Sequence, residues 1–175
     1  MSRRFVPGTG YHGESIRQIL EDHAEDFVPP ISERRLARFL SYLTDPEGSL
    51  LAFDDGDLAG FIAWKPFDEK DIKPDRYQNI ERFSGFAYIK ILFILPAYRR
   101  MGLAKAIRER ALERMADQGF RGVVTTCWAR NEGMIRLNQS MGFSLIGRYP
   151  APWRGPGEES LIHEKRFTPA GSKDS

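Results

Sequence analysis

The stretch LPAYRRMGLAKAI, Leu95 to Ile107, joins a β-rich run to a segment with helical spacing. The run that leads into it, FAYIKILFIL (residues 86–95), is almost continuously apolar, which is typical of a central strand buried on both faces. Pro96 ends this strand, because proline cannot donate a hydrogen bond to a β-ladder. Two arginines and Gly102 follow at once. The stretch therefore predicts either an ordinary turn with solvated arginines or a turn that holds an anion.

The start of the helix after this turn is suited to an anion. The first N–H groups of a helix have no helical partner and carry a partial positive charge, and a glycine lets a phosphate approach the backbone. Seven cations against three acids lie between residues 99 and 121, although a solvated helix face explains such an excess equally well. The cations are Arg99, Arg100, Lys105, Arg108, Arg110, Arg114 and Arg121, and the acids are Glu109, Glu113 and Asp117. The turn at Gly102 has neither the Walker spacing GxxxxGK[ST] nor the dinucleotide spacing GxGxxG, because no other glycine lies within this turn.

Composition limits the classes of protein to consider. The 175 residues suit one domain, and 41% hydrophobic and 29% charged residues are ordinary for a soluble globular chain. A net charge of +2 gives no general argument for nucleic acid. Cys127 is the only cysteine, so an internal disulfide is excluded and a reducing, cytoplasmic setting is expected. The first ten residues have no apolar stretch, so no signal peptide is expected, and the longest charge-free apolar run (residues 91–98) is too short to span a bilayer.

The apolar spacing predicts the element order α-α-β-β-insert-β-α-β-α-β-β, hence an α/β (α+β) fold with a mixed sheet and helices on both faces. Ser32 and Asn131 are expected to cap helices, and Gly119 to end one. We expect a single domain over residues 1–175, with a core at about 8–167 and a disordered tail at about 168–175. The expected helices lie at 13–27, 29–43, near 76–83, up to about 118 and at 131–142, and the strands within 49–67 (a hairpin with an Asp-Gly turn), at 86–95, 122–128, 144–150 and 160–167.

Two segments resemble the motifs of one family. ILPAYRRMGLA (residues 94–104) has arginine, glycine and alanine at positions 99, 102 and 104. It resembles the pyrophosphate-binding motif Arg/Gln-x-x-Gly-x-Gly/Ala of the GCN5-related N-acetyltransferase (GNAT) family. NEGMIRLNQSMGF (residues 131–143) resembles the second signature, an asparagine, a usual tyrosine seven positions later, and Gly-Phe. The element order also matches over about residues 8–167. The resemblance implies an acyl-CoA N-acyltransferase fold, a central mixed sheet with a splayed strand pair flanked by helices.

The resemblance also implies acetyl-CoA as cofactor. In such proteins the N–H groups of the turn bind the pyrophosphate, and the end of the preceding strand holds the pantetheine arm. The N–H of Ile94 would polarise the thioester carbonyl as an oxyanion hole does. Asn131 would contact the arm, and it also has the simpler explanation of a helix cap. The implied cofactor-binding residues are Leu92, Phe93, Ile94, Arg99, Arg100, Met101, Gly102, Leu103, Ala104, Lys105, Asn131 and Asn138.

Two positions depart from the family's catalytic pattern. Many relatives place a tyrosine acid where this chain has Asn138, whose amide donates a hydrogen bond to sulfur but gives up no proton near pH 7. Many place a glutamate where this chain has Lys90, the wrong charge for a resting base. Tyr88 is a candidate acid or relay or else a packing aromatic, and Cys127 is a weak candidate nucleophile, with no histidine near it in sequence. The candidate catalytic residues are Ile94, Asn138 and Tyr88, with a water-relayed base as one alternative.

The acceptor is expected to be an amine whose identity the sequence does not give. In this family the acceptor generally meets the first two helices, the central strand ends and the last hairpin. The first helix ends in four acids that would attract a cationic amine or form a solvated end: Glu21, Asp22, Glu25 and Asp26. The insert at residues 68–85 would cover the acceptor or form a homodimer contact. Trp153, in a Pro/Gly loop, is a candidate acceptor wall or interface anchor.

We therefore expect an acetyl-CoA-dependent N-acetyltransferase that transfers the acetyl group to a primary amine of a small molecule or a protein by direct attack. A non-catalytic acyl-CoA-binding sensor is the alternative, because the usual acid and base are both replaced. Nucleic acid is not an expected partner, because no aromatic stacking platform accompanies the arginines. No membrane partner is expected either. His12, His23 and His163 lack the spacing of metal ligands, so no metal is expected.

Overall fold

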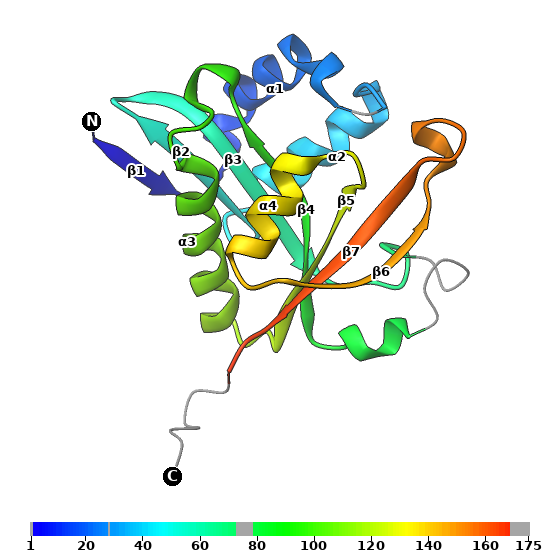
Figure 1. Ribbon diagram of the computed structural model, residues 1–175. Coiled ribbons are helices and arrows are strands. Elements are labelled where there is room, and N and C mark those ends of the chain that lie inside the picture. The colour runs from blue at the N-terminus through cyan, green and yellow to red at the C-terminus, as the bar shows by residue number, and fades with distance from the viewer. Residues whose placement is uncertain (1, 28, 73–78, 169–175) are drawn as a thin grey trace. The chain divides into compact units, whose positions relative to one another are not determined.

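The computed structural model describes residues 2–27, 29–72 and 79–168 (Figure 1). The chain divides into two compact units. The first unit comprises Met1–Lys65 and Lys90–Ala111, and the second comprises Pro66–Ile89 and Leu112–Ser175. Strand β4 (Phe86–Ile94) and helix α3 (Leu103–Asp117) contribute residues to both units. Apart from Thr168, the tail expected at 168–175 lies outside the described residues, as do residues 76–78 of the expected short helix.

The strands of the first unit form an antiparallel ladder. β2 (Ser49–Asp54) and β3 (Asp57–Pro66) make the predicted hairpin, and the two turn residues between them, Asp55 and Gly56, have φ of 50° and 100°. These positive φ values are what a two-residue hairpin turn requires, and the Asp-Gly pair supplies them. β1 (Arg3–Val6) pairs antiparallel with β2 and was not predicted, because four residues that begin with two arginines show no apolar alternation.

Two helices pack on one apolar cluster of this unit. α1 (Gly13–Asp22) and α2 (Glu33–Leu43) follow the 3₁₀ turn Gly10–His12 and are separated by another, Ala24–Asp26. The helix expected over 13–27 is therefore shorter. Ser32 is the N-cap residue of α2, as predicted, and its carbonyl accepts from the Leu36 N–H at 2.8 Å. Its side chain, however, makes no capping hydrogen bond. The cluster contains Ile16, Leu20, Leu36, Leu43, Leu51, Phe61, Ala63, Ile91 and Phe93.

Helix α3 shows a regular buried stripe. Ile107, Ala111 and Met115 recur at every fourth position and are fully buried. At the C-terminal end Gly119 has φ of 84°, its N–H donates to Ala116 at 2.9 Å, and the Phe120 N–H donates to Met115 at 3.1 Å. A glycine in the left-handed region that closes the last carbonyls is a helix C-cap, so the predicted role of Gly119 is confirmed.

The second unit contains the remaining strands and helix α4. β5 (Gly122–Trp128) pairs in parallel with β4 from Phe86↔Gly122 to Ile89↔Thr125, and β7 (Glu159–Arg166) pairs antiparallel with both β5 and β6 (Ser144–Pro150). α4 (Glu132–Ser140) and the 3₁₀ turns Ile80–Phe83 and Pro152–Arg154 complete it. Its apolar cluster contains Ile72, Ile80, Phe83, Phe86, Tyr88, Val124, Tyr149 and Ile162.

The hydrogen-bonded strand order is β1-β2-β3-β4-β5-β7-β6. The parallel β4–β5 pair beside antiparallel pairs confirms the predicted mixed sheet. Within the described parts of the chain, no helix combines the length and the apolar character that crossing a bilayer requires.

Candidate functional site

The end of strand β4 presents the backbone of Ile94 on the edge that faces away from β3. The Leu95 N–H donates to the Ala59 carbonyl at 3.0 Å, and the Phe93 carbonyl oxygen lies 2.7 Å from the place a Cβ on Gly60 would occupy. Because backbone groups of successive strand residues point to opposite edges, the N–H and carbonyl of Ile94 point the other way. The Ile94 N–H is therefore not used by β3, and its role as an oxyanion-hole donor stays a prediction.

Arg99 holds this strand end through its side chain. Its Nε donates to the Ile94 carbonyl at 2.9 Å, its Nη2 lies 3.4 Å from Asp26 Oδ2, and its guanidinium carbon lies 5.5 Å from the centre of the Phe93 ring. The arginine of the pyrophosphate motif thus makes contacts that fix the strand end and the turn that follows it. The role of Arg99 in binding the cofactor stays a prediction, since all of these contacts lie within the chain.

The turn at residues 99–105, called the 99–105 turn below, has two residues in the left-handed region. Arg100 has φ of 63° and Gly102 has φ of 77°. Helix α3 begins directly after it, and its first helical bond runs from the Ala106 N–H to the Gly102 carbonyl at 3.1 Å. The N–H groups before Ala106 therefore have no acceptor one helical turn back.

The 99–105 turn also has room for a bound group. A Cβ built on Gly102 would meet nothing within 4 Å, so the space beside this glycine is open. Open space, N–H groups at a helix start and the positive end of the helix dipole fit the pyrophosphate of a coenzyme A. The charge of α3 is less available than its sequence indicates, because Arg108 is buried and Lys105 lies 3.8 Å from Glu109.

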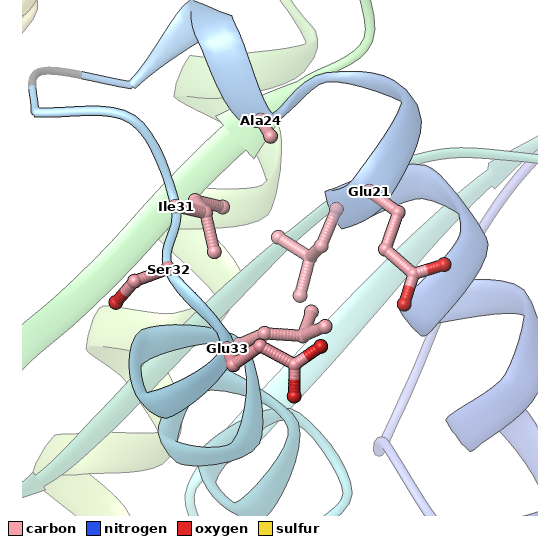
Figure 2. Close-up of a pocket in the computed structure, with 7 residues that line it drawn as sticks. Glu21, Ala24, Ile31, Ser32 and Glu33 are labelled. Carbon is pink, nitrogen blue, oxygen red and sulfur yellow. The ribbon is translucent and has the colours of Figure 1, made fainter.

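The acidic end of α1 borders a small pocket (Figure 2). The pocket has a volume of about 250 Å³. Its apolar lining is Leu20, Ala24, Ile31 and Leu36, and its polar lining is Glu21, Ser32 and Glu33. In Figure 2, Glu21 extends from α1 and Glu33 from the start of α2. Asp26, by contrast, lies 3.4 Å from Arg99 Nη2 and 3.1 Å from His23 Nδ1. Glu21 lines the pocket, whereas Asp26 pairs with side chains of the chain itself.

Tyr88 is buried in the second unit. Its hydroxyl lies 2.8 Å from Thr126 Oγ1. Burial raises the pKa of Tyr88 well above its ordinary range, and the Thr126 hydrogen bond opposes this only in part. Tyr88 therefore keeps its proton throughout the neutral range and is suited to donating a hydrogen bond, not to accepting a proton.

Asn138 is fully buried, and its amide faces a thiol. Asn138 Nδ2 donates to Cys127 Sγ at 4.0 Å, and Sγ lies 3.9 Å from His163 Nδ1. The sequence offered no histidine near Cys127, because His163 arrives from β7, where it pairs in register with Thr125. No local signal in the sequence places it there, because the approach of His163 to Cys127 depends on the register of β7 against β5.

The other predicted residues have defined local partners. Asn131 Oδ1 accepts from the Met134 N–H at 3.0 Å, which confirms Asn131 as the cap of α4. Lys90 Nζ lies 5.7 Å from the centre of the Tyr42 ring. Trp153 is 39% exposed, and its ring lies 6.1 Å from that of Tyr149.

The structure thus gathers Ile94, Arg99 and the rest of the 99–105 turn in one unit, and Tyr88, Asn131 and Asn138 in the other. Leu92 and Phe93 belong with the first group, on the same stretch of β4. The described residues contain no group of three or more histidine, cysteine or acidic side chains that could hold a metal ion.

Comparison with known proteins identifies the family. The acetyltransferase (GNAT) family model matches residues 16–143. An uncharacterised N-acetyltransferase of Mycobacterium tuberculosis is 27% identical over 130 residues, which cover 74% of this chain and 72% of that protein. The N-alpha-acetyltransferase MAK3 of Arabidopsis thaliana is 29% identical over 106 residues, 61% of this chain and 49% of that protein.

Solved structures share the fold. The Arabidopsis thaliana NAA60 structure with a bisubstrate analogue has a TM-score of 0.70 at 25% identity, covering 94% of this chain and 98% of that one. The ribosomal-protein-S18-alanine N-acetyltransferase of Escherichia coli has a TM-score of 0.70 at 19% identity, with 99% of each chain covered, which shows the fold alone. The family model spans most of the chain, and the expected α/β fold is confirmed. The chain belongs to the GNAT family of acetyl-CoA-dependent N-acetyltransferases.

Proposed function

We propose that this chain transfers the acetyl group of acetyl-CoA to a primary amine of a small molecule or a protein by direct attack, with the cofactor's pyrophosphate on the 99–105 turn. The observation that carries the proposal is the geometry from Ile94 to Gly102. One N–H is directed away from β3 at the strand end, and a glycine with open space beside it stands where the helix begins.

Each group of the chain has a separate task in this proposal. Bound acetyl-CoA supplies an acetyl thioester. The N–H groups of the 99–105 turn bind phosphate oxygens, and the Ile94 N–H donates to an oxygen that gains negative charge. Asn138 and Tyr88 are proposed as hydrogen-bond donors, because Asn138 carries a neutral amide and Tyr88 keeps its proton. The amine loses its proton to solvent in this scheme, since no base is assigned.

The pocket between α1 and α2 supports a cationic acceptor. Two carboxylates at an apolar pocket suit an ammonium group carried on an aliphatic stem. Relatives differ in their acceptors: the name of one neighbour specifies a ribosomal-protein alanine, and another is a putative phosphinothricin N-acetyltransferase. We therefore propose a primary amine and test protein and small-molecule acceptors side by side.

Cofactor binding is tested by thermal denaturation with acetyl-CoA. We expect the ligand to raise the melting temperature, and Gly102→Glu to abolish the shift by placing a carboxylate beside the phosphate site. Gly119→Glu is the matched control, because Gly119 also has a positive φ and open space but follows the other end of α3. No shift at millimolar acetyl-CoA in the wild-type chain would overturn the proposal.

Catalysis is tested by the release of CoA thiol against two panels, alkyl amines and diamines in one, peptides with free N-termini or lysines in the other. We expect release with at least one acceptor and a mass increase of one acetyl group on that acceptor. Tight acetyl-CoA binding with no release from either panel would contradict the proposed amine acceptor.

A further inference from the structure

Arg3, on the edge strand β1, reaches the 99–105 turn from almost one hundred residues away in sequence. Its Nη2 donates to the Met101 carbonyl at 2.9 Å. Its Nε lies 3.9 Å from Oδ1 of Asp54, the residue paired with it in register on β2. The side chain thus connects the edge of the sheet to the peptide that joins Met101 to Gly102.

The direction of this contact has a consequence for the other side of the same peptide. A trans peptide is planar, so its carbonyl and its N–H point in opposite directions. When Arg3 holds the Met101 carbonyl toward β1, the Gly102 N–H is directed away from β1. Gly102 is also the residue beside which the space is open. Arg3 therefore controls the direction of a donor that it does not touch.

The turn needs such support because its backbone conformation is unfavourable. Arg100 has a side chain and yet has φ of 63°, and Gly102 on the other side of Met101 has φ of 77°. A side-chain-bearing residue in the left-handed region is strained unless its surroundings hold it. The hydrogen bond to Met101 lies between these two residues, where it opposes relaxation of the turn.

Asp54 orients Arg3. The Asp54 carboxylate is only 5% exposed, and among the described residues its buried Oδ1 has no hydrogen-bond partner, although the Arg3 guanidinium lies beside it. A buried carboxylate needs a cation nearby, so Asp54 favours the Arg3 conformer that points across β2. The order of action is Asp54, Arg3, Met101 carbonyl, Gly102 N–H.

We propose that Arg3 is a positioning residue for the cofactor's pyrophosphate, acting through the Met101–Gly102 peptide; this rests on the proposed binding of acetyl-CoA at the 99–105 turn. Arg3→Ala removes the hydrogen bond and leaves the turn to relax. We expect about tenfold weaker CoA binding in calorimetry, and an intermediate loss for Arg3→Lys, which keeps one charged donor.

Arg4→Ala is the matched control. Arg4 follows Arg3 on the same strand, and its guanidinium packs over Phe53 at 5.3 Å. We expect its CoA affinity to equal that of the wild type. Equal CoA affinity in Arg3→Ala and wild type would overturn the proposal. If the wild-type chain itself does not bind CoA, the proposed cofactor site is overturned, and this inference fails with it.

A double variant separates positioning from folding. Arg3→Ala leaves the Asp54 carboxylate without its cation, which lowers stability, whereas Arg3→Ala with Asp54→Ala removes both charges. We expect the double variant to regain thermal stability in denaturation scans but to keep the weakened CoA affinity. Recovery of both properties together would show that Arg3 serves folding alone, and would overturn its role in positioning.

Discussion

The 99–105 turn and the polar side chains of the second unit (Tyr88 with Thr126, and Asn138 and His163 with Cys127) offer chemistry of different origin. At the turn and the strand end before it, the groups proposed to bind the cofactor are backbone N–H groups, and the side chains of Arg3 and Arg99 donate hydrogen bonds to the carbonyls of Met101 and Ile94. In the second unit, side chains themselves carry the donors. The positions of a glycine and a proline within one segment determine which backbone N–H groups are available at the turn. The contacts of the side chains in the second unit depend instead on partners that lie on other strands.

The largest effect is expected at Gly60, where the backbone of β3 lies close to the end of β4. A Cβ on Gly60 would lie 2.6 Å from Ile94 Cδ1 and 2.7 Å from the Phe93 carbonyl oxygen, which belongs to the backbone. Gly60→Val should lower the free energy of unfolding by about 3 kcal/mol and weaken CoA binding, because the end of β4 must shift. Urea denaturation and calorimetry measure the two effects.

Gly10→Val is the control for this substitution, because a Cβ on Gly10 meets nothing within 4 Å. If Gly60→Val binds CoA with wild-type affinity, the prediction is wrong. That result would mean that the direction of the Ile94 N–H does not depend on the approach of β4 to β3.

The second prediction concerns Tyr88, one of the polar side chains of the second unit. Because burial raises the pKa of Tyr88 in the folded chain, the unfolded chain loses this proton first, above about pH 10. The stability that Tyr88 contributes is therefore complete below pH 10 and falls by about 1.4 kcal/mol per pH unit above it. Tyr88→Phe should lack this alkaline loss when unfolding is measured in urea at pH 9, 10 and 11.

Tyr11→Phe provides the control, since Tyr11 is 93% exposed and should leave the alkaline loss unchanged. An identical pH dependence in wild type and Tyr88→Phe would contradict the prediction. Tyr88 would then lose its proton in the same pH range in the folded and the unfolded chain.

The smallest effect is expected at Asn131, for which two roles have been given, the cap of α4 and a contact with the cofactor. Asn131→Ala should lower stability by about 1 kcal/mol through loss of the cap, and Asn131→Asp should restore it, because aspartate caps as well. Calorimetry with CoA then sharpens the comparison. If both variants bind CoA more weakly, the amide contacts the cofactor; wild-type affinity in both would limit Asn131 to capping.

The sequence predicts the turn well because its determinants are local. Pro96 ends a strand, Gly102 adopts a positive φ, and the spacing of Ile107, Ala111 and Met115 specifies a helix, all within one short segment. The role of Arg3 could not be predicted from local sequence, because β1 is short and charged. The contact of Arg3 with the Met101 carbonyl also joins residues 98 positions apart. The position of His163 beside Cys127 depends on strand register, and Ser32 occupies the predicted N-cap position without the side-chain hydrogen bond that its residue type favours.

The lone thiol of the chain has a practical consequence. Cys127 is 6% exposed and lies between an amide and an imidazole. A disulfide reagent added to the folded protein should therefore react with released coenzyme long before it reaches the polypeptide, giving turnover assays a low background. The same reagent, used without substrates, reports how often the second unit opens, since each labelled chain records one exposure of that sulfur.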